Sequence, residues 1–86
     1  MLVCLTKSER DYSSTVDNFV EEFERRAGAG AITVMNPETI EGESFATAHD
    51  ILEFPAIVAV DGNGTTMAEW KGLPLPSYDE VSYYAK

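Results

Sequence analysis

The sequence holds a single cysteine, Cys4, among its 86 residues. One cysteine excludes an internal disulfide, a CxxC redox pair and a cysteine-rich zinc site within one chain. Basic residues are also scarce, since 6 Lys and Arg stand against 15 Asp and Glu and give a formal net charge of −9. A charge of this sign repels phosphate groups and therefore argues against binding to DNA or RNA.

Long apolar runs are missing as well. The apolar start of the chain, residues 1–5, is followed at once by the polar segment 6–10, so it lacks the longer apolar stretch of a signal peptide. No window of the sequence approaches the roughly 18 apolar residues of a membrane span. We therefore predict no membrane contact and a cytoplasmic location, which also suits an unpaired thiol.

Hydrophobic residues nevertheless make up 44% of the chain. This fraction is enough to fill one small core, and the length allows no second one. The sequence shows no internal repeat and no low-complexity tract. We predict a single domain over residues 1–86.

Four segments have the composition of strands. Residues 1–6 and 31–35 are short apolar runs, and residues 57–60 form the most apolar and most β-branched run, which is typical of a central strand. The following segment, 61–64, reads Asp-Gly-Asn-Gly and contains two strong hairpin dipeptides. Residues 65–70 should therefore return antiparallel beside the strand at 57–60.

The first predicted helix follows the first strand. Its apolar residues recur with helical spacing at Val16, Phe19, Val20 and Phe23. Arg25 and Arg26 stand in its last turn, where positive charge suits the helix dipole, and Gly28 is placed to end it.

Two more helices are expected. The second shows the same spacing at Phe45, Ala48, His49 and Leu52. It should run to about Leu52, because the residue before Pro55 avoids the helical region. The third begins with a capping box formed by Ser77 and Glu80. Its inner face is predicted to consist of Tyr78, Val81 and Ala85.

The predicted order of elements is therefore β-α-β-α-β-β-α. The second half of the chain contains the pattern His49-x-Ile51-x-x-Phe54-Pro55-Ala56, followed by a four-residue apolar strand, a glycine-rich turn, a strand and Lys71-Gly72. Through this pattern and the order of its elements, the chain resembles the thioredoxin family. The resemblance implies an α/β class, minimal thioredoxin-like fold with a mixed four-stranded sheet and helices on both faces. It also implies that Pro55 is a cis-proline and that the backbone of Phe54 pairs with an extended peptide or with glutathione.

The same resemblance places Arg10, Asp11, Tyr12 and Ser13 where the family has its CxxC motif. Both cysteines are absent, so dithiol exchange is excluded by residue type. No base is evident beside the Ser13 hydroxyl, which makes it a poor nucleophile. Cys4 falls within the first strand, where a buried and inert core thiol is expected.

Several other residues invite a functional interpretation. His49 is the only histidine, and we interpret it as packed and hydrogen-bonded. Trp70 is interpreted as cover for the sheet, although an aromatic wall of a peptide groove is the alternative. The carboxylates on two segments are interpreted as solvated faces, with a basic partner as the alternative. They are Glu21, Glu22, Glu24, Glu38, Glu41 and Glu43. 

We predict no catalytic residue, no metal site and no cofactor, because phosphate-binding glycine loops, Ser/His/Asp sets and metal-ligand spacings are absent. The hypothesis that follows is a redox-inactive domain that binds a peptide or protein segment. Its candidate site comprises Arg10, Asp11, Tyr12, Ser13, Phe54 and Pro55, with Tyr12 and Phe54 on one rim. Main-chain pairing would supply affinity there, and aromatic side chains would supply selectivity.

Two alternatives stay open. The first is a structural domain that assembles with itself, as a homo-oligomer, or within a larger complex through a sheet edge or a helix face. The second is an enzyme that uses glutathione or the single Cys4 thiol.

Overall fold

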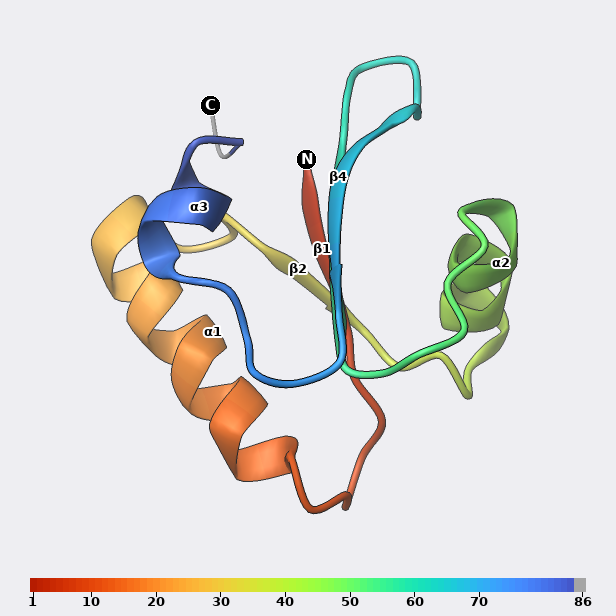
Figure 1. Ribbon diagram of the computed structural model, residues 1–86, viewed down its shortest axis with the longest axis horizontal. Helices are drawn as coiled ribbons and strands as arrows, with labels where there is room; N and C mark the ends of the chain where they lie inside the picture. The colour runs from red at the N-terminus through yellow and green to blue at the C-terminus, as the bar shows by residue number, and fades with distance from the viewer. Residues whose placement is uncertain (85–86) are drawn as a thin grey trace.

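The computed structural model describes residues 1–84 as an α/β unit with one sheet. The elements are β1 (Leu2–Leu5), α1 (Ser13–Ala27), β2 (Thr33–Met35), α2 (Ile40–Ala48), β3 (Ala56–Val60), β4 (Thr66–Lys71) and α3 (Tyr78–Ser82). The four strands form a mixed sheet in the order β2-β1-β3-β4. Helices α1 and α3 cover one face and α2 covers the other (Figure 1). The predicted class, element order and mixed four-stranded sheet are confirmed.

The length of the connection between consecutive strands agrees with the direction in which they pair. β1 pairs parallel with β2 across the long α1 crossover, and antiparallel with β3. β3 pairs antiparallel with β4 through the short turn at 61–64, where Asp61 Oδ1 accepts hydrogen bonds from the N–H groups of Asn63 (2.9 Å) and Thr65 (3.0 Å). The hairpin prediction is confirmed, and the segment 57–60 is central as expected.

The core has two halves, one on each face of the sheet. Leu2 and Cys4 of β1 face α1, whereas Val3 and Leu5 face α2, because successive side chains of a strand point to opposite faces. All residues of β1 and β3 are buried. Both faces of the two central strands are covered, which agrees with their entirely apolar sequences.

Helix α1 forms as its sequence pattern predicts. Val16, Phe19 and Phe23 are buried against the sheet. Arg25 and Arg26 lie in the last turn, and Gly28 ends the helix at a φ of 106°, a conformation that glycine adopts at little cost. β2 is shorter than predicted, since it begins at Thr33 rather than at residue 31.

The prediction for α2 was wrong in its boundary and in its inner face. The helix ends at Ala48, and Gly42 and Ala46 are its buried residues. Asp50 has a left-handed φ of 55°, and the N–H groups of Asp50 and Ile51 donate to the carbonyls of Thr47 (3.3 Å) and Ala46 (2.8 Å). This pair of hydrogen bonds is a Schellman motif, which ends a helix.

The Schellman motif was not expected because an aspartate, instead of the usual glycine, occupies its left-handed position. It turns the chain so that Ile51 is buried and Leu52 exposes 88% of its surface. Leu52 therefore lies outside the helix and outside the core.

The third helix begins as predicted. Ser77 and Glu80 form the capping box, with the Glu80 N–H donating to Ser77 Oγ and the Ser77 N–H donating to Glu80 Oε2. Val81 is fully buried, and the Tyr78 ring stacks on Phe19 at 4.9 Å. Ala85 lies outside the described residues. None of the helices within residues 1–84 has the length and apolar character that a membrane crossing requires.

Gly42 fixes the position of α2, and this yields a first prediction. A Cβ added there would lie 1.9 Å from the carbonyl oxygen of Asn36. The change Gly42→Ala should therefore lower the free energy of unfolding by about 1–3 kcal/mol, although alanine usually favours a helix by about 1 kcal/mol. Urea unfolding monitored by circular dichroism measures the difference.

The matched control is Gly62→Ala. Gly62 lies in the turn, and an added Cβ would meet nothing within 4 Å. Equal unfolding midpoints for the two variants would show that the close approach of Gly42 to Asn36 is not a constraint.

Candidate functional site

The loops that carry the candidate residues meet at one end of the sheet. Leu5 of β1 is paired with Met35 of β2 and with Ala56 of β3. Because β1 and β2 run parallel and β3 runs antiparallel to them, the chain after Leu5, the chain after Met35 and the chain before Ala56 meet at this end. The candidate residues from the two halves of the sequence therefore become neighbours only through the sheet register.

The Phe54–Pro55 segment enters β3 at this end. The Phe54–Pro55 peptide bond is cis, and so is the Leu73–Pro74 bond, which was not predicted. The carbonyl oxygen of Pro55 accepts a hydrogen bond from the Gly72 N–H (2.8 Å). The backbone N–H and C=O of Phe54 have no hydrogen-bond partner among residues 1–84. Phe54 thus retains one unpaired backbone donor and one unpaired backbone acceptor within residues 1–84.

An apolar groove lies beside Phe54, on the face of the sheet that α2 covers. Its apolar lining consists of Pro37, Ala46, Ile51, Leu52 and Phe54, and its polar lining of Lys7, Glu38, Glu43 and Thr47. Its volume of about 250 Å³ lies below the roughly 300–1,000 Å³ of sites that enclose a small molecule. The groove is suited to a side-chain anchor of a longer ligand.

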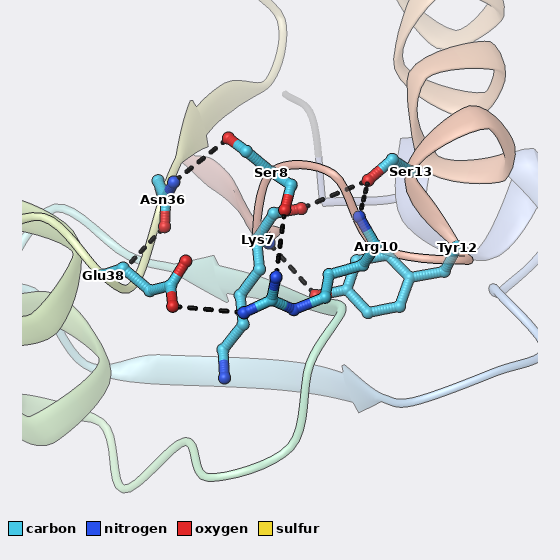
Figure 2. Close-up of polar contacts among 7 residues, drawn as sticks. All are labelled: Lys7, Ser8, Arg10, Tyr12, Ser13, Asn36 and Glu38. Carbon is cyan, nitrogen blue, oxygen red and sulfur yellow. Dashed lines mark hydrogen bonds and ion pairs between the residues drawn. The ribbon is translucent and has the colours of Figure 1, made fainter.

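The loop from Arg10 to Ser13 is held by its own hydrogen bonds (Figure 2). Ser13 Oγ accepts from the Arg10 N–H (2.9 Å) and donates to the Lys7 carbonyl (3.3 Å). The Arg10 guanidinium reaches Glu38 at 3.2 Å, so this loop is also tied to the segment before α2. Asp11 is exposed and makes no polar side-chain contact within the described part of the chain.

Lys7 joins the two halves of the candidate site, and no sequence pattern marks it as a site residue. Its backbone N–H donates to the Tyr12 hydroxyl (3.1 Å), and its Nζ lies 5.3 Å from the centre of the Phe54 ring. Tyr12 packs against the core beneath α1, whereas Phe54 packs against the core beneath α2. The two aromatic residues therefore lie on opposite faces at one end of the sheet, with Lys7 between them.

A second hollow lies on the α1 side of Lys7. Its volume is about 400 Å³, and Lys7 is the residue that lines both hollows. The other lining residues are Thr6, Ser8, Glu9, Ser13, Asp17, Val34 and Asn36. Ser13 thus faces this mostly polar hollow, and the apolar groove is bounded on that side by Lys7 and Glu38.

Cys4 is fully buried in β1. Burial, with a smaller contribution from the Asp17 carboxylate, raises the pKa of the Cys4 thiol from its ordinary 9.0 to about 12. Nucleophilic thiols require the opposite shift and an accessible sulfur.

Two further residues occupy the positions expected of packed side chains. His49 Nδ1 is hydrogen-bonded to Thr66 Oγ1 at 2.7 Å, and its ring lies 4.4 Å from that of Phe45. Trp70 is half-buried against the core beneath α1. In the part of the chain that the structure describes, no group of three or more His, Cys, Asp or Glu side chains is arranged to hold a metal ion.

No protein-family model matches this chain, and no curated protein matches its sequence. A function for this chain is therefore inferred from the geometry of the site.

The hydrogen bonds of Ser13 give a second prediction. Ser13→Ala removes one acceptor and one donor that hold the loop 7–13, so the free energy of unfolding should fall by about 1–2 kcal/mol. Hydrogen exchange at the Arg10 amide should also become faster. Urea unfolding and amide exchange measured by NMR test both effects.

The neighbouring Ser14 is the matched control, because it is exposed and its side chain makes no hydrogen bond within residues 1–84. Ser14→Ala should change the free energy of unfolding by less than about 0.5 kcal/mol. Equal effects of the two substitutions would contradict the proposed anchoring of the loop.

The raised pKa of Cys4 gives a third prediction. The folded state keeps the thiol proton up to about pH 12, whereas the unfolded state loses it above about pH 9. Ionisation of Cys4 therefore leaves stability unchanged below pH 9 and favours unfolding as the pH rises from 9 toward 12. Relative to Cys4→Ala, the wild type should lose as much as about 1.4 kcal/mol for each pH unit in this window.

Urea unfolding of both proteins across the pH range measures this difference, and titration of tyrosine and lysine cancels because both proteins contain the same residues. A difference in stability that is constant from neutral pH to pH 12 would show that the thiol is not buried.

Proposed function

We propose that this domain binds an extended peptide or protein segment without covalent chemistry, at the Phe54–Pro55 edge and the adjoining apolar groove. The observation that carries the proposal is the unpartnered N–H and C=O of Phe54 beside a groove lined by Ile51, Leu52 and the Phe54 ring. An extended segment gains affinity by pairing its main chain with such a backbone and specificity by inserting a side chain into the neighbouring groove.

The resemblance to thioredoxins supports this proposal from the sequence, since it assigns peptide pairing to Phe54. Arg10 and Ser13 act in it as scaffold: they hold the loop that carries Lys7 against the groove. Tyr12 contributes by positioning the Lys7 backbone through its hydroxyl.

The location of Cys4 supports a function without thiol chemistry. A glutathione-dependent or single-thiol enzyme would need its sulfur at a surface, and Cys4 lies between β2 and β3 in the middle of the sheet. An unpaired thiol is stable in a reducing compartment, which supports the cytoplasm as the site of action.

A pair of matched variants tests the groove. Leu52 and Ile40 are both aliphatic and expose 88% and 87% of their surface, but of the two only Leu52 lines the groove. The probe is a capped heptapeptide with an Ile-Leu-Val centre and neutral Gln flanks, titrated into the ¹⁵N-labelled full chain. Leu52→Ala should weaken binding about fivefold to tenfold, since it removes apolar contact area, and Ile40→Ala should leave the affinity unchanged.

The amide shifts locate the bound peptide. We expect changes at Lys7 and across residues 51–56, with little change at the turn 61–64. Absence of binding, or equal weakening by the two variants, would overturn the proposal. Shifts confined to the edge strands β2 or β4 that grow with protein concentration would favour the self-assembling domain.

A further inference from the structure

The carboxylates of this acidic protein are not equally available to a partner. On α1, Arg25 contacts Glu21 and Glu22, and Arg26 contacts Glu22. Glu24 accepts a hydrogen bond from the Gly30 N–H (2.9 Å). Glu21 and Glu22 of α1 are therefore paired with arginine within the chain, and Glu24 is hydrogen-bonded.

The situation at the groove is different. Glu43 lines the groove from α2, and its carboxylate has no ion pair or hydrogen bond within residues 1–84. Glu53 precedes Phe54 and is likewise without a polar partner among these residues, and its Oε2 would lie 3.2 Å from a Cβ added at Gly72. Glu38, the third carboxylate here, is paired with Arg10.

The nearby positive charges do not neutralise these two carboxylates. Lys7 lies over the Phe54 ring at 5.3 Å, and Lys71 is paired with Glu69 at 3.3 Å. The groove therefore has an apolar floor, one cation at the Phe54 ring and one unpaired carboxylate, that of Glu43, in its lining. The second unpaired carboxylate, that of Glu53, lies outside the lining, on the loop before Phe54 and near Gly72.

We propose, building on the function given above, that the groove selects an extended segment in which an apolar anchor residue is flanked by basic residues. The anchor enters the groove between Ala46, Ile51 and Leu52. A flanking lysine or arginine side chain lies near the Glu43 carboxylate in the lining, and a second one reaches the Glu53 carboxylate on the loop before Phe54. Neither carboxylate has an ion pair within residues 1–84.

The selectivity comes from exposed ion pairs and is therefore moderate. Each such pair changes affinity by about twofold to threefold, and the effect falls as salt screens the charges. The same carboxylates repel a segment with acidic flanks. The affinities for basic and acidic segments should therefore differ more than the affinities for basic and neutral segments.

Three capped heptapeptides with the same Ile-Leu-Val centre test the inference. On each side of the centre they carry two Lys, two Gln or two Glu residues. Titration of the full chain by NMR should give an affinity for the Lys peptide about tenfold above that for the Glu peptide at low ionic strength. The ratio should fall by more than half in about 0.5 M salt.

Charge-removing variants identify the residues responsible. Glu43→Gln and Glu53→Gln should each reduce the Lys-to-Glu ratio about twofold to threefold. Glu41→Gln is the matched control, because Glu41 lies on the same helix but does not line the groove. It removes the same net charge and should leave the ratio unchanged.

The outcomes separate this inference from the function beneath it. Equal affinity for all three peptides, with shifts at residues 51–56, would overturn the charge preference and leave peptide binding intact. A ratio lowered equally by Glu41→Gln would assign the preference to net charge alone and overturn the assignment to the groove. Binding of none of the peptides would overturn both proposals, and concentration-dependent shifts at Leu52 without peptide would identify a second copy of the chain as the occupant.

Discussion

The burial of the two central strands from both sides constrains the rest of this structure. All residues of β1 and β3 are buried, and alternate side chains supply two separate cores. Each core requires its own cover, which α1 and α3 provide on one face and α2 on the other (Figure 1). Polar groups cannot be placed along such strands without a large desolvation cost, so polar chemistry is confined to the loops at their ends.

The sheet register then decides which loops meet. Leu5 lies beside Ala56 in the β1–β3 pair and beside Met35 in the β1–β2 pair. Lys7 follows β1 by two positions and so reaches the segment that enters β3, where its Nζ lies over the Phe54 ring. Residues that are far apart in the chain thus form one site because β1 and β2 end, and β3 begins, at the same end of the sheet.

The end of α2 determines how apolar this site is. The Schellman motif at Ala46–Ile51 ends the helix, and after it Ile51 is buried and Leu52 is exposed. If the helix continued to Leu52, the Leu52 side chain would lie on the helix surface instead of lining the groove beside Phe54. The apolar groove beside Phe54 is therefore a consequence of one left-handed residue, Asp50.

The sequence patterns were sufficient for the helices and strands that have strong periodicity or turn chemistry. The spacing from Val16 to Phe23 placed α1, and the Asp61–Gly64 turn placed the hairpin. Both signals are local, so they predict these elements without knowledge of the tertiary contacts. α2 was predicted less well, because its short apolar pattern fits more than one helical face and Asp50 is not a usual residue for a left-handed helix end.

The sequence by itself determined the α/β class, the order of elements and the absence of a dithiol motif, since these depend on residue types and on local periodicity. It also placed Cys4 in a buried strand. Only the tertiary structure decided that Tyr12 and Phe54 face opposite cores, that Lys7 links them, and that Glu43 and Glu53 are left without partners. These relations depend on strand register and on the direction of each side chain, which are fixed by packing between residues distant in sequence.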